Sequence, residues 1–241
     1  MIEAFTQQRT IGKFTFMDYK GSNLMNTVNQ EINNKFPGAD IGSYVFPEGS
    51  TIVDVGANIG MISIMIARQN PTCTVYAFEP MPMTYAYLAQ NIHLNGTYNV
   101  LPFQMGVAGV SKVAVIRGVL DNNSGGSTMW SKSAQNPVQN WDQHVSRVLC
   151  VTPDEILKIA GYPEEIAFLK IDCEGSEHEI VEKAHLNTAF WSSVKRCEGE
   201  LHENQILRDL GYSNGDTETK IASLVSGPIR FHSILVGKFR S

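Results

Sequence analysis

The sequence predicts an α/β fold in which a mostly parallel sheet carries helices on both faces. Three observations support this prediction: short apolar segments alternate with amphipathic ones from Thr51 onward, a glycine turn follows the first apolar segment, and polar residues stand where later apolar segments end. Parallel strands joined by right-handed crossovers form a ligand crevice at their carboxyl ends. Functional side chains are therefore expected at that edge of the sheet.

The composition excludes two classes of partner. A chain of 241 residues can form one large α/β domain with a full core. Its net charge is −5 and its 19 Lys and Arg are scattered, whereas nonspecific binding to nucleic acid or anionic lipid needs clustered basic residues. The longest apolar run, 61–67, is too short to span a bilayer, and the N-terminus lacks a signal-peptide pattern. We expect a cytoplasmic protein that binds neither nucleic acid nor membranes; no oligomeric state is predicted.

Residues 1–50 are expected to form a cover segment. An amphipathic helix is predicted there from four apolar residues spaced four apart, Leu24, Val28, Ile32 and Phe36. Residues 51–241 are expected to form the domain itself, with a hairpin and loop insertion around 112–147.

The elements of the domain follow in order. A strand at 51–56, a helix from Met61, a strand at 73–78, a helix at 83–95 and a strand at 99–105 make a βαβαβ unit. A later helix begins after Thr152, which has a capping-box glutamate three residues on, and another helix runs to Ala184. The remaining strands are expected at 112–119, 147–151, 167–172, 194–202, 220–225 and 230–239.

The turn in IVDVGANIG (52–60) predicts a cationic ligand without phosphates. Asn58 replaces the middle glycine that lets a dinucleotide pyrophosphate approach the backbone. Asp54 adds a carboxylate before the turn, which disfavours an anion and favours a cation. Glu79 ends the next strand, where a carboxylate can accept the hydroxyls of a ribose. S-adenosylmethionine, a nucleoside with a charged amino-acid arm, satisfies all three observations.

Three segments resemble one known family. VDVGANIG, the FEP at 78–80 and FLKIDCEGSEHEIV at 168–181 are similar to the S-adenosylmethionine-dependent methyltransferases of the FkbM family. The resemblance covers about residues 45 to 205. It implies a class I (Rossmann-like) methyltransferase fold with a seven-stranded, mostly parallel sheet, and it implies O-methylation of a sugar or other secondary metabolite.

The resemblance also implies a cofactor site. Gly56 and Gly60 would lie behind the methionine arm, and Glu79 would bind the ribose. The adenine would lie near Met105 and Gly106. The predicted cofactor-binding residues are Asp54, Gly56, Ala57, Asn58, Gly60, Glu79, Pro80, Met105, Gly106 and Asp172.

Asp172 is a candidate catalytic residue because it stands at the carboxyl end of a central strand, where the methyl acceptor must lie. Lys170 shares its side of that strand and needs an acidic partner, either Asp172 or an acid on the next strand. Glu177 and Glu179 are interpreted as ordinary acids at a helix start, favoured there by the helix dipole.

Glu198, Glu200 and His202 alternate, so a strand would place all three on one face. Either the strand has already ended and these residues are solvated, or they belong to the site. In the second case His202 is the preferred general base, because its unperturbed pKa of about 6.5 suits proton removal at neutral pH. Alternatively, Asp172, Glu200 and His202 could together hold a divalent cation such as Mg²⁺.

The predicted function is transfer of a methyl group from S-adenosylmethionine to a hydroxyl of a small molecule. Two alternatives use the same scaffold: a nicotinamide-dependent oxidoreductase, which the missing middle glycine disfavours, and a non-catalytic module that only binds S-adenosylmethionine. Asp172 and His202 favour catalysis over the second alternative.

Overall fold

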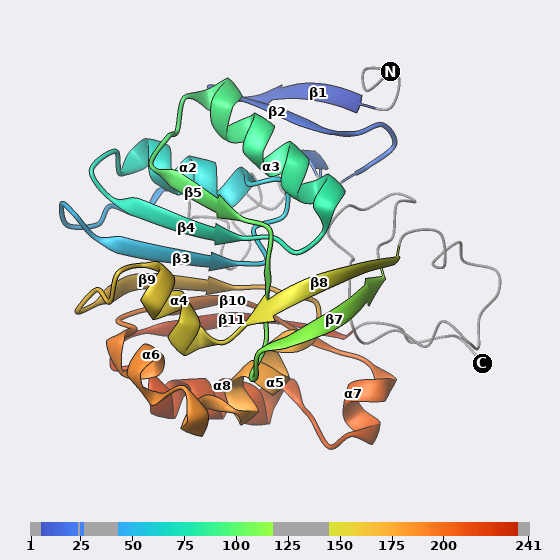
Figure 1. The fold of residues 1–241 in the computed structure, drawn as a ribbon, viewed down its shortest axis with the longest axis vertical. Coiled ribbons are helices and arrows are strands. Elements are labelled where there is room, and N and C mark those ends of the chain that lie inside the picture. The colour runs from blue at the N-terminus through green and yellow to red at the C-terminus, as the bar shows by residue number, and fades with distance from the viewer. Residues whose placement is uncertain (1–5, 24, 27–42, 118–144, 236–241) are drawn as a thin grey trace.

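The computed structural model describes residues 6–23, 25–26, 43–117 and 145–235 (Figure 1). Its central sheet has the strand order β11-β10-β9-β3-β4-β5, and every neighbouring pair is parallel. The strands of this sheet are β3 (Thr51–Val55), β4 (Thr74–Phe78), β5 (Val100–Phe103), β9 (Ile166–Ile171), β10 (Cys197–Glu203) and β11 (Ile229–Leu235).

Helices cover both faces of this sheet, as predicted. In Figure 1, α2 and α3 lie toward the top of the view, and α5, α6 and α8 lie toward the bottom. The helices are α2 (Met61–Gln69), α3 (Pro82–Asn95), α4 (Pro153–Ile159), α5 (Ser176–Glu182), α6 (Thr188–Ser193), α7 (Gln205–Asp209) and α8 (Asn214–Leu224), and the 3₁₀ helix η4 is Ala184–Leu186.

The α/β class is confirmed, but the main sheet of the described residues has six strands instead of seven. The strand predicted at 220–225 is wrong, because this segment is the end of α8. Ser213 caps that helix by accepting a hydrogen bond from the backbone N–H of Asp216. Ile221 and Val225, both buried, are four residues apart, which is the spacing of a helix face.

Alternation along the strands decides which side chains face the site. On β3, Ile52 packs into the core beneath α2 and α3, while Val53 packs into the core on the opposite face. Asp54 therefore faces α2, and the register of β3 and β9 places Lys170 beside it. The sheet thus brings two charged residues together on its α2 face.

The first described residues form a hairpin that the sequence did not predict. Strands β1 (Thr6–Ile11) and β2 (Phe14–Tyr19) pair antiparallel, and Phe16 is fully buried in the core beneath α3. Asn91 of α3 accepts a hydrogen bond from Met17 N at 2.7 Å and donates one to Met17 O at 3.0 Å. Of the helix predicted from Leu24, only residues 25–26 are described, so that helix and the division at residue 50 stay predictions.

A second sheet has the order β6-β8-β7, with β6 at Gly106–Val107, β7 at Lys112–Arg117 and β8 at Val145–Val151. β7 and β8 pair antiparallel, which confirms two of the predicted strand segments. The part of the insertion between them, 118–144, lies outside the described residues.

The predicted capping box at the start of α4 is confirmed, since Thr152 Oγ1 accepts from Glu155 N at 3.2 Å. In the part of the chain that the structure describes, no helix has the length and apolar character needed to cross a membrane.

Candidate functional site

The turn after β3 is held tightly against the ends of β4 and β9. Gly56 has φ 79°, and a Cβ there would lie 1.8 Å from the carbonyl oxygen of Asp172. The backbone N–H groups of Gly56 and Ala57 both donate to Phe78 O at 3.0 Å. Gly60 has φ 87°, and a Cβ there would lie 2.4 Å from Leu88 Cδ1, at the end of a side chain that can shift. Gly56 therefore needs glycine for steric reasons as well as for its φ angle, whereas Gly60 needs it mainly for its φ angle.

Glu79 joins this turn to the start of α3. Its Oε2 accepts from Asn58 N at 3.0 Å, and its Oε1 accepts from Met81 N at 2.9 Å. Burial raises the pKa of Glu79 to about 7, against the effect of these two hydrogen bonds. A carboxylate has about four lone-pair positions, so Glu79 can accept further bonds from a ligand.

Asp54 and Lys170 form a buried ion pair beneath the turn. Asp54 is fully buried, its Oδ2 accepts from Ser63 Oγ at 2.5 Å, and its Oδ1 lies 3.2 Å from Lys170 Nζ. Lys170 Nζ also lies 3.4 Å from Asp172 Oδ2. The expectation that Lys170 has an acidic partner is confirmed for Asp172, whereas the second partner, Asp54, comes from β3 and not from the next strand along the chain. Asp54 thus faces a cation of the protein itself and has no surface open to a ligand.

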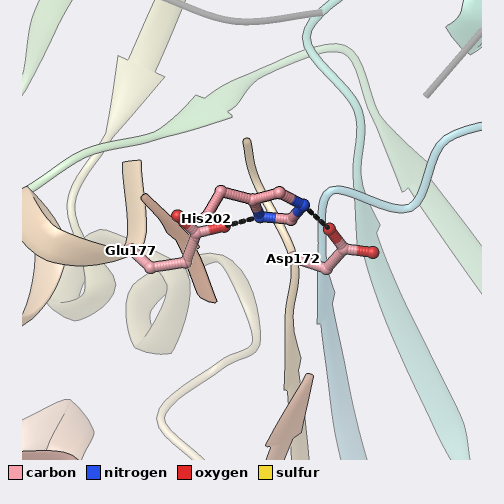
Figure 2. A group of neighbouring side chains, drawn as sticks. All are labelled: Asp172, Glu177 and His202. Carbon is pink, nitrogen blue, oxygen red and sulfur yellow. Dashed lines mark hydrogen bonds and ion pairs between the residues drawn. The ribbon is translucent and has the colours of Figure 1, made fainter. Parts of the chain in front are cut away.

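His202 lies among carboxylates (Figure 2). Its Nδ1 is 3.2 Å from Glu177 Oε1, and its Nε2 is 3.5 Å from Glu200 Oε2 and 3.9 Å from Asp172 Oδ1. Burial alone would lower the pKa of His202, but the hydrogen bonds to Glu177 and Glu200 and the surrounding negative charge raise it to about 12. His202 is therefore an imidazolium at neutral pH. The argument for a neutral base, which rested on its ordinary pKa, does not hold in this environment.

Glu177 differs from the ordinary helix-start acid that was expected. It is fully buried, Oε1 accepts from Cys173 N and Oε2 from Gly175 N, each at 2.7 Å. Although burial raises its pKa, the bonds from His202 and the backbone lower it below the ordinary value. Glu177 thus shapes the turn after β9. Its partner His202 is 25 residues away, so no local pattern indicated the pair.

The polar end of β10 is part of the strand. β10 pairs with β11 through Glu203, so the interpretation that the strand had already ended is wrong. Pairing with β9 stops at Gly199, because the chain of β9 turns away there. Glu200 and His202 therefore extend beyond β9 at the carboxyl edge of the sheet.

Glu198 has a different role from the other two residues of that alternation. It is 1 % exposed. It is in register with Lys170 of β9, before the carboxyl edge of the sheet. Arg196 Nε donates to it at 2.6 Å, and Arg230 Nε donates to it at 2.9 Å. The hydroxyl of Tyr44 adds a bond of 3.1 Å. These hydrogen bonds within the cluster compensate the charge of Glu198.

Three carboxylates remain partly accessible at the edge. The side chains of Asp172, Glu174 and Glu200 are 28 %, 24 % and 32 % exposed. Glu174 has the left-handed φ of 54°, and burial raises its pKa to about 8, so it is largely protonated at neutral pH. Of these three acids, Glu200 lies nearest to His202 Nε2 at 3.5 Å, followed by Glu174 at 3.8 Å and Asp172 at 3.9 Å.

The predicted metal ligands are only partly grouped as expected. Among the described residues, ligand atoms of Asp172, Glu177 and His202 lie within 4.8 Å of one another, so Glu177 stands where Glu200 was predicted. Glu177 Oε1 already accepts from Cys173 N and faces His202 Nδ1 at 3.2 Å, Oε2 accepts from Gly175 N, and a metal-binding histidine must be neutral. This donor set fits a divalent cation poorly.

The segments predicted to contact adenine lie together. A Cβ on Gly106 would lie 2.7 Å from Cys150 Sγ and 3.7 Å from Pro80 Cβ. Met105 N donates to Phe103 O at 2.9 Å at the end of β5. Pro80, Met105 and Gly106 thus border the same edge as Glu79.

Comparison with known families agrees with this geometry. The methyltransferase FkbM domain matches residues 54–213, which include all of the predicted site residues. The chain belongs to the FkbM methyltransferase family. It is accordingly an S-adenosylmethionine-dependent methyltransferase, and the oxidoreductase and non-catalytic alternatives lose their support.

Several proteins are similar to this FkbM methyltransferase. "Methyltransferase 1" of Beauveria bassiana is 26 % identical over 171 residues, which cover 66 % of this chain and 68 % of the relative. "31-O-demethyl-FK506 methyltransferase FkbM" of Streptomyces tacrolimicus is 46 % identical over 43 residues, or 18 % and 16 % of the two chains. The crystal structure of M. jannaschii TYW2 in complex with AdoMet is 23 % identical with a TM-score of 0.31, and the match covers 41 % of this chain and 42 % of that one.

Proposed function

We propose that this FkbM methyltransferase transfers the methyl group of S-adenosylmethionine to the oxygen of a hydroxyl on a small molecule, a sugar or other secondary metabolite. The observation that carries the proposal is the placement of Asp172 and Glu200 at the edge beside the glycine turn. Carboxylates accept hydrogen bonds from hydroxyls and can take up the proton that methylation releases. The name of the Streptomyces relative, which specifies an O-methyl position, supports an oxygen acceptor.

The residues present fit the cofactor. Gly56, Ala57 and Asn58 form a turn that is held against the ends of β4 and β9, where its backbone would face the amino-acid arm. Glu79 would accept the ribose hydroxyls. The adenine would lie against Pro80, Met105 and Gly106. The sulfonium supplies an activated methyl group, and its positive charge suits an edge that is rich in carboxylates.

We assign the proton transfer to Asp172, with Glu200 beside it. Burial raises the pKa of the Asp172 carboxyl, which makes it a stronger base than an exposed aspartate. His202 is already protonated and offsets the repulsion between the acids. Alignment of donor and acceptor can supply about 7–11 kcal/mol of the barrier, and a positioned base contributes about 10²–10⁴-fold.

The proposal predicts methyl transfer to hydroxyl compounds. Purified protein incubated with methyl-labelled S-adenosylmethionine should label a sugar or polyol acceptor and release S-adenosylhomocysteine. The Asp172→Asn variant should lower turnover by about 10²–10⁴-fold while the cofactor dissociation constant changes little. Labelling of amines or tRNA in place of hydroxyl compounds would reject the proposed acceptor class, and full turnover of Asp172→Asn would reject its role as base.

Metal removal provides a separate prediction. Because Glu177 is held by backbone N–H groups and His202 is protonated, we expect EDTA treatment to leave methyl transfer unchanged. Methyl transfer measured before and after dialysis against EDTA checks this expectation. Loss of activity that added Mg²⁺ restores would instead assign a divalent cation to Asp172, Glu200 and His202.

A further inference from the structure

Lys170 contacts both halves of the proposed site. Its Nζ donates to the carbonyl oxygen of Gly56 at 3.2 Å, in the turn assigned to the cofactor. The same Nζ atom lies 3.4 Å from Asp172 Oδ2, on the side of the proposed methyl acceptor. It also lies 3.2 Å from Asp54 Oδ1, which is buried beneath the turn. One ammonium group therefore joins the turn after β3 to the acid at the end of β9.

The neighbouring strands explain why Lys170 points toward the site. In register, Lys170 has Asp54 on one side and Glu198 on the other. Glu198 is already bonded to Arg196 and Arg230, so its charge is compensated without Lys170. The lysine side chain, which is 10 % exposed, instead extends to Asp54 and Asp172. The charged residues of β3, β9 and β10 thus determine the direction in which the Lys170 side chain points.

We propose that Lys170 is a positioning residue for methyl transfer, which sets the Asp172 carboxylate at a fixed place relative to the Gly56 carbonyl. The inference rests on the proposed role of Asp172 as the proton acceptor. Methyl transfer needs donor, acceptor and base in line, and a displacement of about 1 Å can cost about 10²-fold in rate. The turn itself keeps other supports, since Gly56 N and Ala57 N donate to Phe78 O. Loss of Lys170 should therefore impair turnover more than cofactor binding.

A competing explanation is that Lys170 only neutralises the buried Asp54. The Lys170→Met variant alone does not separate the two, because it leaves a buried carboxylate unpaired and can fail to fold. The double variant Lys170→Met, Asp54→Asn removes both charges and keeps similar side-chain shapes. If neutralisation is the whole role, this double variant should recover both thermal stability and turnover.

We expect the double variant to recover its melting temperature but not its turnover. Its kcat should fall about 10²-fold, while its dissociation constant for S-adenosylmethionine, measured by calorimetry, stays within about 10-fold of wild type. Amide hydrogen exchange should also rise at Asp172, whose N–H donates to Val55 O. A stable double variant with wild-type kcat and wild-type exchange would overturn the proposal.

A matched control comes from a second lysine–carboxylate pair. Lys112 Nζ lies 2.6 Å from Glu179 Oε2, between β7 and α5. The double variant Lys112→Met, Glu179→Gln should keep wild-type kcat and wild-type exchange at Asp172; an equal loss of kcat in it would also count against a specific role of Lys170. Calorimetry and hydrogen exchange need no acceptor. Absence of methyl transfer by the wild-type protein therefore tells against the hydroxyl acceptor, whereas unchanged exchange in the Lys170 double variant tells against the positioning role.

Discussion

Replacing Gly56 by alanine is expected to abolish useful binding of S-adenosylmethionine. The new Cβ would lie 1.8 Å from the backbone oxygen of Asp172 and 2.8 Å from its carbonyl carbon, so the turn or the end of β9 must move. A displacement that costs about 3 kcal/mol of binding free energy weakens the affinity by about 100-fold. Isothermal titration calorimetry with S-adenosylmethionine measures this effect. A Gly56→Ala variant that binds the cofactor like wild type would contradict the assigned turn.

Gly161→Ala is the matched control for this variant. Gly161 has φ 77°, close to the 79° of Gly56, but a Cβ there meets no atom within 4 Å. Both variants incur the cost of a left-handed backbone, about 1–3 kcal/mol of stability. Only Gly56→Ala adds a clash with backbone. The difference in cofactor affinity between the two variants therefore measures the close approach of the two segments.

Replacing Glu177 by glutamine is expected to lower the free energy of unfolding by about 3–5 kcal/mol, the usual cost of removing one partner of a buried ion pair. The change removes the charge that faces His202 Nδ1, and an amide cannot accept from both Cys173 N and Gly175 N. Chemical denaturation measures the difference. Glu182→Gln, on the exposed side of the same helix, is the control and should change stability by less than about 0.5 kcal/mol.

The same variant should change the dependence of stability on pH. The pKa of His202 is raised from 6.5 to about 12, so its contribution is complete below pH 6.5 and is lost as the pH rises toward 12. The pKa of Glu177 is lowered from 4.5, so its contribution is present above pH 4.5 and is lost as the pH falls through the folded value. Glu177→Gln should therefore lower the pH at which stability is lost on the alkaline side. It should also reduce the loss of stability on the acid side. Identical pH profiles for variant and wild type would show that the pair adds nothing to stability.

Local patterns predicted much of the fold and the location of the site. The strand at Thr51–Val55, the turn at Gly56 and the acid at Glu79 follow from a short apolar run and from the turn residues that bound it. The helix that was mistaken for a strand, at 220–225, is a short apolar run whose pattern suits both structures. The hairpin at Thr6–Tyr19 was missed because more than half of its residues are polar and its packing partner, α3, is remote in sequence.

The charges of the site depended on contacts that no local pattern contains. Asp54 was expected to face a cationic ligand, and the structure pairs it with Lys170 from another strand. His202 was expected to be a neutral base, and Glu177, 25 residues away, contributes to its protonation. These residues were predicted to lie near the site, but their protonation states and exposure were not.

The sequence by itself determined the βαβαβ unit over 51–105 and the glycine turn after its first strand, because short apolar segments and the turn residues that bound them are local features of the chain. Only the tertiary structure decided that Lys170 joins Gly56 to Asp172, that His202 carries a proton and that Asp172 and Glu200 remain accessible. The physical reason is that pKa values and burial are set by charges and atoms which folding brings together from distant strands.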